Sequence, residues 1–531
     1  MNTPPNASTK AGVTAADGVD AAHAAEFDPT AAIGVDPHAG LTSKIGRVAS
    51  ASAVALIFGE LITFVQTVAL ARLLSPAEVG LFVAGTVLVT FLGNFVEGGL
   101  RSGLIHREDR LDDAAETVFY VTAVGGLLMA LLTLACAPLI GLIFHDREIG
   151  LITAASAGVL FLYSFTNVPE ALLQREFNVR RRLIVGPAVS VSFAVTAVTL
   201  AANGFGVWSQ VAGLYASYVV WVIAVWCISD WRPGRGRFRF DLWRELARYG
   251  FPLVLGALGA RLQNLGEAVV LGRGLSSAAL GHFRYAQRIA QIPVRAIIEI
   301  GAIALFPAFS RISSDRDRMR VAYLSATRVG VIGAAAVSGL MLSLGVPSVV
   351  VMFGEPWREA GLLVAAMAGL GVGKAITSVS EESIKGGGRT SLLNWYTAVE
   401  VTLGIGLLIV LTSLFGLLGA GLSISVTALL VALTCVVLAK PVVGFSAREF
   451  MVAISPPLPA ATVATVITAC LEHFVLHADA HSTLVGVCFL VLDTIVFLLV
   501  YGVVLAAILP SPARAAVKAA QGLLVSRGRS A

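Results

Sequence analysis

Two stretches of the sequence decide the fold: 70-LARLLSPAEVGLF-82 and 271-LGRGLSSAALGHF-283. They align without a gap, and each joins the first and second apolar runs of its own half of the chain. Seven aligned pairs are identical: Leu70/Leu271, Arg72/Arg273, Leu74/Leu275, Ser75/Ser276, Ala77/Ala278, Gly80/Gly281 and Phe82/Phe283. Chance similarity between segments rich in Leu, Ala and Gly is the alternative. The matched position in each half favours an internal repeat.

The composition is that of a membrane protein. Of the 531 residues, 56% are hydrophobic and 13% are charged, and the mean hydropathy is +0.83. Soluble domains usually contain about 25% charged residues. Apolar stretches of about 20 residues, enough to cross a hydrocarbon core of about 30 Å, recur along the chain. Because helices satisfy their own backbone polar groups in lipid, these stretches predict an all-α polytopic membrane protein.

Length and hydropathy place fourteen transmembrane spans on the chain. They cover approximately residues 48–72, 79–100, 116–143, 149–173, 183–203, 206–229, 247–272, 280–309, 322–353, 360–385, 392–414, 417–439, 458–477 and 483–509.

The basic residues between the spans indicate the topology. With the N-terminus inside, 27 Lys and Arg residues fall on the cytoplasmic side and four on the opposite side. An excess of Lys and Arg marks cytoplasmic loops, and one missing span would reverse the alternation from that point onward. We therefore expect both termini in the cytoplasm, and the net charge of +5 is explained without nucleic acid.

The basic segment 230–246 separates two halves of six spans each. Since the halves run in the same direction, they predict two six-helix lobes related by an axis along the membrane normal. The expected organisation is a disordered cytoplasmic tail (1–43), an N-terminal lobe (44–229), a basic cytoplasmic linker (230–246), a C-terminal lobe (247–440), two further transmembrane helices (441–509) and a cytoplasmic tail (510–531).

Ionisable residues inside the spans are the candidates for function, since a charge near the bilayer centre costs about 2.5–3.5 kcal/mol. The N-terminal lobe has carboxylates there but no base at mid-membrane. Glu60 is its most central carboxylate, so we expect Glu60 to be buried and to exchange a proton during transport. Glu97 and Glu170 are further candidates for ion coupling. A hydrogen-bonded structural glutamate is the alternative.

The intramembrane bases lie in the C-terminal lobe. At 100° per residue, Arg284, Arg288, Gln291 and Arg295 fall on one helical face about 80° wide. Two further bases, Arg261 and Lys374, lie at similar depth in other spans.

These bases favour a water-filled cavity that binds an anion. The guanidinium fork donates two parallel hydrogen bonds to phosphate, so we expect these six residues to bind a diphosphate. The alternative is a set of internal salt bridges to Glu267, Glu299 or Glu400, with Arg284 extending its charge to the interface.

The sequence also resembles a known family. The stretches ALARLLSPAEVGLFVAG, EGGLRSGLIHRED, NGFGVWS, YAQRIAQIPVRAIIEIGAIALFPAFSRI and VVMFGEPWREAG are similar to those of polysaccharide-export (Wzx-like) flippases of the MOP superfamily. The resemblance covers residues 45–440. It implies two six-helix lobes that form a V around a central cavity. It also implies alternating-access transport of undecaprenyl-diphosphate-linked oligosaccharides across the cytoplasmic membrane of a bacterium. Arg288 and Arg295 match the polar face of the eighth helix of that family.

Three other functions were weighed. The related lipid II flippases look as if they also use arginines in the first lobe, and the first lobe of this chain has none at mid-membrane, which disfavours a peptidoglycan precursor. A drug or cation antiporter would favour an acidic cavity rather than a base-rich lobe. A membrane glycan ligase or polymerase usually carries a large outer loop, and the outer connections here are short. We therefore expect no catalysis and no cofactor. The expected partners are the lipid-linked glycan, membrane lipid, and glycosyltransferases or a polymerase of the same pathway.

The histidine-rich stretch 471-LEHFVLHADAH-481 remains outside this interpretation. Its two histidines at i and i+4 lack the intervening glutamate of a zinc-protease helix, so we expect no metal there.

Overall fold

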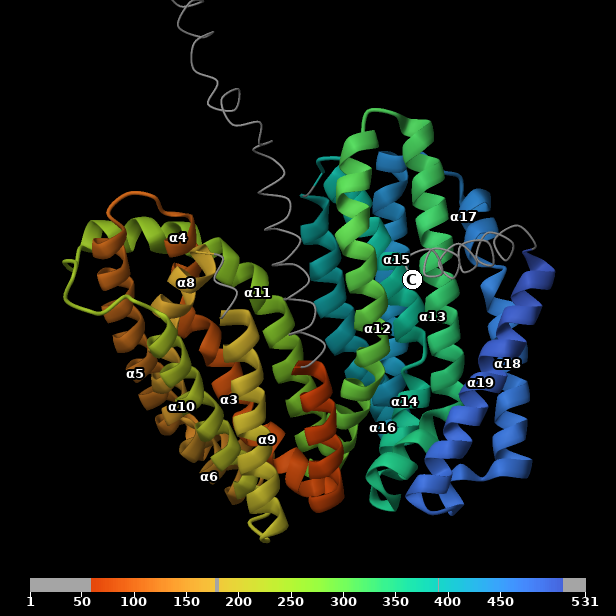
Figure 1. Ribbon diagram of the computed structural model, residues 1–531, viewed down its shortest axis with the longest axis horizontal. Helices are drawn as coiled ribbons and strands as arrows, with labels where there is room; N and C mark the ends of the chain where they lie inside the picture. The colour runs from red at the N-terminus through yellow and green to blue at the C-terminus, as the bar shows by residue number, and fades with distance from the viewer. Residues whose placement is uncertain (1–58, 177–180, 390, 510–531) are drawn as a thin grey trace, which may run out of the picture.

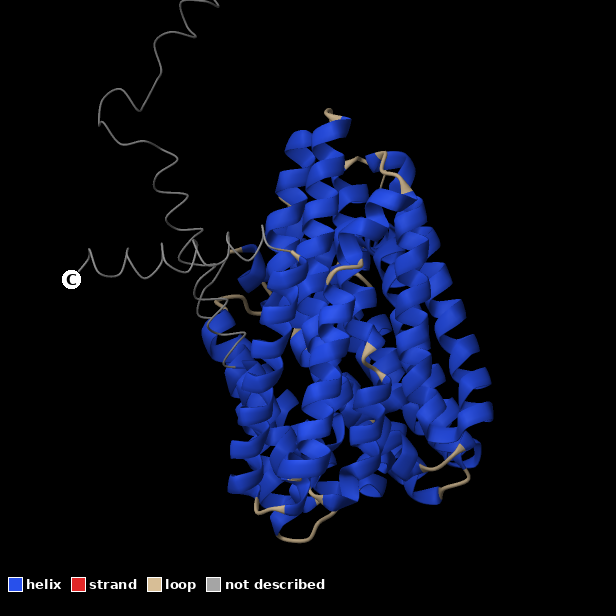
Figure 2. Cartoon of the chain, turned by 90° about the vertical axis from the view of Figure 1, so that its right-hand side faces the viewer, coloured by secondary structure: helices blue, strands red, loops and turns tan. Residues whose placement is uncertain are grey.

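The computed structural model describes residues 59–176, 181–389 and 391–509. Within these ranges the chain is helical, with loops at the two ends of the helix bundle and short breaks between helices inside it (Figure 2). The predicted tails, residues 1–43 and 510–531, lie outside the described residues.

The first half begins with a helix over residues 59–73. The helices that follow are α3 (Pro76–Glu97), α4 (Leu100–His106), α5 (Leu111–Phe144), α6 (Arg147–Ser156), α7 (Gly158–Ser164), α8 (Asn167–Arg175), α9 (Gly186–Ala202) and α10 (Trp208–Ile228).

The second half contains α11 (Phe240–Gly274), α12 (Ser277–Ile312), α13 (Arg316–Phe353), α14 (Arg358–Ala366), α15 (Gly369–Gly386) and α16 (Leu392–Val443). Helices α17 (Ala447–Ile454), α18 (Pro457–Leu471) and α19 (Thr483–Ile508) complete the described chain. α11 begins inside the stretch predicted as a linker, seven residues before the predicted start of the C-terminal lobe.

The all-α membrane class is confirmed, but the count of fourteen spans is not. Eight described helices are long and apolar enough to cross a membrane, or up to ten if each of two bent pairs is one span. α11 and α12 are not among them, since they carry the arginines of the second lobe, and charged residues lower the hydropathy of a helix. The first predicted span is described only from residue 59.

One apparently continuous helix contains two of the predicted spans. α16 runs over 52 residues, but Gly416 has φ 58° and ψ −138°, a conformation that strongly favours glycine. A Cβ added to Gly419 would overlap the carbonyl of Leu411, so the chain folds back at this point. The predicted spans 392–414 and 417–439 therefore lie side by side as a helical hairpin.

The internal repeat is visible in how the helices begin and bend. Ser75 and Ser276, an identical pair of the repeat, are the N-caps of α3 and α12, and each accepts a hydrogen bond from a backbone N–H three residues later. The fourth predicted span of each half is also broken. The bends are 42° between α7 and α8 and 43° between α14 and α15. The repeat therefore extends beyond the thirteen aligned residues.

The two lobes form a V (Figure 1). They converge at the end that carries the loops 203–207, 274–276 and 354–357, here called the closed end. They separate towards the end that carries the loops 107–110 and 229–239, the open end. A continuous apolar core joins the lobes at the closed end, with Leu74 and Ile149 of the first lobe and Phe283 and Trp357 of the second among its buried members.

The repeat itself forms the contact at the closed end. A Cβ on Gly80 would overlap the carbonyl of Ser277, and a Cβ on Gly281 would overlap the carbonyl of Pro76. Gly80 aligns with Gly281, and Pro76 aligns with Ser277. The two copies of the repeat therefore pack against each other with local two-fold symmetry, and α3 and α12 approach so closely that only glycine fits.

Candidate functional site

A cavity of about 320 Å³ lies between the lobes. Helices α3, α7 and α10 of the first lobe line it, and Arg261 of α11 reaches it from the second. An adjoining cavity of about 220 Å³ is lined by Arg261, Asn264 and Arg284 together with Thr86 and Thr90 of α3. Of the six predicted diphosphate-binding residues, Arg261 is the one that faces the first lobe across both cavities.

Three aromatic rings form one wall of the larger cavity. Tyr163, Tyr218 and Trp221 lie with their ring centroids 5.6–6.1 Å apart. Two buried donors line the same cavity, since neither Asn94 Nδ2 nor Trp221 Nε1 has an acceptor among the described residues. A buried donor without an acceptor is destabilising. The cavity therefore combines apolar faces, free donors and a guanidinium, a combination suited to an oxygen-rich ligand.

The sequence analysis did not include the aromatic wall. Tyr218 and Trp221 are three residues apart and so share a face of α10, while Tyr163 comes from the end of α7 just before the bend. The spacing within α10 could have predicted that Tyr218 and Trp221 lie together. The sequence could not predict that Tyr163 lies beside them, because this depends on the packing of α7 against α10.

Arg284 is neutralised inside the second lobe. Its guanidinium donates to Glu267 Oε2 at 3.0 Å, to Asn264 Oδ1 at 3.2 Å and to Gln287 Oε1 at 3.0 Å. Glu267 is 2% exposed, so this ion pair is held within the lobe. The contacts of Arg284 therefore favour the alternative, an internal salt bridge to Glu267, over a guanidinium that is free to bind an anion.

Arg288, Gln291 and Arg295 share a face of α12 that lies near the helix 59–73. Arg295 donates to Gln291 Oε1 at 3.1 Å and lies 3.9 Å from Glu60. The side chain of Arg295 is 61% exposed, and Arg288 is exposed as well. No described residue forms a hydrogen bond or ion pair with Arg288, and neither arginine lines the cavities reached by Arg261. The three residues therefore lie apart from Arg261, and the six predicted residues do not form a single cluster.

Lys374 pairs with an acid of the neighbouring helix. Its Nζ lies 2.6 Å from Glu400 Oε1, which places the pair between α15 and α16. This is one of the internal salt bridges that the sequence analysis left as an alternative. The side chain of Glu299 lies outside the described part of the structure.

The three candidate ion-coupling carboxylates each lie beside a polar partner. Glu60 is 60% exposed beside Arg295, so the expected burial of Glu60 is wrong. Glu97 accepts a hydrogen bond from the Tyr163 hydroxyl at 2.9 Å, and Glu170 lies 3.4 Å from Arg101. A role in ion coupling remains a prediction for all three.

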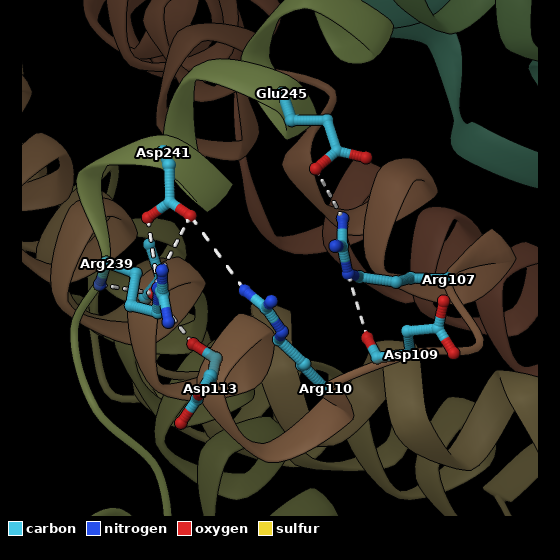
Figure 3. Close-up of polar contacts among 8 residues, drawn as sticks. Arg107, Asp109, Arg110, Asp113, Arg239, Asp241 and Glu245 are labelled. Carbon is cyan, nitrogen blue, oxygen red and sulfur yellow. Dashed lines mark hydrogen bonds and ion pairs between the residues drawn. The ribbon is translucent and has the colours of Figure 1, made fainter.

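At the open end, the basic segment binds the loop between α4 and α5 (Figure 3). Arg107 lies 3.0 Å from Glu245, and Asp113 accepts from the Arg237 N–H at 2.8 Å. Arg239 and Asp241 form a two-pronged pair, and the hydrogen bond from Arg239 holds the pKa of Asp241 below its ordinary value. These contacts attach the start of α11 to the first lobe, while its later part contacts α12 and α16.

A family model described as "Polysaccharide biosynthesis protein" matches residues 69–361. The chain belongs to this family. The resemblance noted in the sequence is thereby confirmed, and the match includes both copies of the repeat, the aromatic wall and Arg261.

Two relatives align over most of their length. The chain is 27% identical over 432 residues to the succinoglycan biosynthesis transport protein ExoT of Rhizobium meliloti (strain 1021), covering 78% of this chain and 84% of that protein. It is 22% identical over 417 residues to the lipopolysaccharide biosynthesis protein WzxC of Escherichia coli (strain K12), covering 77% and 83%.

Solved structures share the fold. The lipid II flippase MurJ in an inward closed conformation superposes with a TM-score of 0.65 at 14% identity, covering 84% of this chain and 97% of that one. An inward-facing multidrug resistance MATE transporter of the MOP superfamily gives 0.60 at 17% identity, covering 74% and 98%. The predicted two-lobe architecture of a multi-pass membrane protein is confirmed, and the chain shares the fold of these two transporters.

Proposed function

We propose that the protein moves an undecaprenyl-diphosphate-linked oligosaccharide across the bacterial cytoplasmic membrane by alternating access, with both termini in the cytoplasm. The observation that carries this proposal is the cavity between the lobes, where Arg261 faces Tyr163, Tyr218 and Trp221. The relatives support the class of substrate, since ExoT is named a succinoglycan biosynthesis transport protein and TuaB of Bacillus subtilis (strain 168) a teichuronic acid biosynthesis protein.

The cavity suits the two chemical parts of such a substrate. A guanidinium binds phosphate oxygens through parallel charge-assisted hydrogen bonds. Sugar rings present C–H groups that pack on aromatic faces and hydroxyl oxygens that accept from free donors such as Asn94 Nδ2 and Trp221 Nε1. We infer that Arg261 holds the diphosphate and that the aromatic wall holds the first sugars.

Arg288 and Arg295 would serve an earlier step. Both are exposed on a face of α12 outside the cavity. In this proposal they attract the lipid diphosphate before it reaches Arg261. The mid-membrane bases of the second lobe argue against a cation antiporter, and the lack of a mid-membrane base in the first lobe argues against lipid II as the main cargo.

The test uses purified protein in lipid vesicles with a fluorescent undecaprenyl-diphosphate-linked oligosaccharide. Arg261→Ala should lower transport about ten- to a hundred-fold, because one charge-assisted contact contributes about 1.5–3 kcal/mol. Arg261→Lys should be intermediate, since lysine keeps the charge but loses the fork. Arg244→Ala, an exposed arginine on the same helix, is the matched control.

Three results would contradict the proposal. Normal transport by well-folded Arg261→Ala would show that Arg261 does not bind the substrate. Preferred transport of lipid II or of a cationic dye would show that the proposed substrate is wrong. Formation of new glycosidic bonds by the purified protein would make it an enzyme.

A further inference from the structure

A second polar site lies in the core formed by α13, α18 and α19, away from the cavity between the lobes (Figure 1). Asp493 is in the middle of the apolar helix α19 and is completely buried, and neither of its oxygens accepts a hydrogen bond from a described donor. Its interacting neighbour is the carboxyl group of Glu472, which is 7% exposed and lies where α18 widens into a π-helical turn over Glu472–Leu476.

The register of the three helices places other polar groups at the same level. On α13, Gly339 touches Phe497 of α19 and Thr465 of α18, while Val351 touches Gly486 of α19. α13 and α19 are antiparallel with equal rise per residue, so Asp493 lies level with Ser343. On α18, the same level falls between Thr468 and Glu472.

Several of these polar groups have no hydrogen-bond partner among the described residues. Thr468 is fully buried, and its hydroxyl has no hydrogen-bond partner among the described residues. Glu472 accepts from the Ala478 N–H at 2.8 Å through Oε1, while Oε2 has no donor. Pro347 has no N–H, so the carbonyl of Ser343 loses its usual helical partner.

No base lies on the neighbouring stretches of these three helices to neutralise the two carboxyl groups. Residues 329–353 of α13, residues 457–471 of α18 and the rest of α19 contain no charged side chain. The turn beyond Glu472 contributes His473 and His477, which are exposed, and Asp479, which Arg358 binds at 2.8 Å. Two buried carboxylates at the same level of an apolar core repel strongly, and a shared proton removes the repulsion and supplies the missing donor.

We propose that Glu472 and Asp493 hold one exchangeable proton between them, and that this proton couples transport to the proton gradient. The exposed imidazoles of His473 and His477 lie within one turn of Glu472 and provide its route to water at the closed end. In each cycle one carboxyl oxygen takes up a proton from one side of the membrane and releases it to the other, and no heavy-atom bond changes. The coupling rests on the proposed function, whereas the proton site does not.

Infrared difference spectroscopy on the purified protein tests the site directly. At neutral pH the wild type should show the C=O stretch of one buried protonated carboxyl group that shifts in D₂O. Asp493→Asn and Glu472→Gln should each abolish this band, because the amide then supplies the donor and the remaining carboxylate stays ionised. Asp109→Asn, an exposed carboxylate at the open end, should leave the band unchanged.

A band that survives in both folded variants would overturn the proposal. A wild type without the band, whose spectrum instead changes on adding sodium, would overturn it too and assign the site to a metal cation.

Transport in vesicles tests the coupling. Wild-type transport should rise at least several-fold when a proton gradient is imposed, and Asp493→Asn should lose that response while keeping normal protein abundance. An equal response in wild type and variant would overturn the coupling. If wild-type protein transported no lipid-linked glycan while the infrared band was present, the proposed function would fail and the proton site would stand.

Discussion

The two copies of the repeat have similar sequences but different contacts. Arg72 of the first copy donates from Nε to the Met352 carbonyl at 2.7 Å and from Nη2 to the Val351 carbonyl. These carbonyls lie at the C-terminal end of α13, where a helix has unpaired acceptors. Arg273, its counterpart, is exposed and forms no hydrogen bond or ion pair with the residues that the structure describes.

The closed end combines a symmetric pair of contacts with further contacts on one side. The symmetric pair, here called the symmetric frame, is the contact of Gly80 with Ser277 and of Gly281 with Pro76. Arg72 adds a connection between the lobes on one side alone. Trp357 reinforces that side, since its indole N–H donates to the Ala71 carbonyl at 2.8 Å. In alternating access, opening this end requires all of these contacts to break.

The largest effect is expected from the glycines of the symmetric frame. Gly80→Ala or Gly281→Ala places a Cβ on the backbone of the opposite helix and should destabilise the closed end by about 1–3 kcal/mol. Spin labels at the exposed matched positions Leu73 and Gly274 should move apart. Gly125→Ala, where a Cβ meets nothing within 4 Å, is the control. Unchanged label distances in both variants would show that these glycine contacts do not hold the closed end together.

A smaller effect should distinguish the two arginines. Arg72→Ala removes two bonds to α13 and should shift the equilibrium towards opening about tenfold, a modest value because Arg72 is exposed. Arg273→Ala should leave it unchanged. The same label pair serves for the measurement, and equal responses of the two variants would mean that the asymmetry has no energetic consequence.

The smallest effect concerns the helix caps. Ser75 forms a reciprocal capping box with Glu78, whereas Ser276 has Ala279 at the matched position and makes the single bond to its N–H. Ser75→Ala should lower the free energy of unfolding by about 1 kcal/mol, and Ser276→Ala by less. Thermal unfolding in detergent measures both. A larger loss for Ser276→Ala would reverse the comparison.

Much of the fold could be predicted because its signals are local. Apolar length predicted the membrane helices before any packing was known, whereas Ser75 and Ser276 entered the sequence analysis only as an identical pair of the repeat, and the structure shows them as N-caps. The hairpin at Gly416 was predicted as a break between two spans. The count of fourteen spans is not confirmed, since polar residues in α11 and α12 lower the hydropathy by which spans are counted.

The candidate site was predicted in part. Residue types and helical spacing placed Arg261, Arg288 and Arg295 correctly as bases within helices, but could not show which of them remain free. Arg284 and Lys374 are paired with Glu267 and Glu400 on neighbouring helices. Such pairing depends on distances between helices, which no spacing along a single helix contains.

The sequence by itself determined the class of protein, the repeat and the faces of its helices, because hydropathy, capping and helical periodicity act over a few residues. The tertiary structure alone decided the contacts between segments hundreds of residues apart. It placed Gly80 against Ser277, Arg72 against the end of α13, and Glu472 beside Asp493. The physical reason is that a charge or a carbonyl is stabilised by whatever lies within a few ångströms, and only packing sets which residue that is.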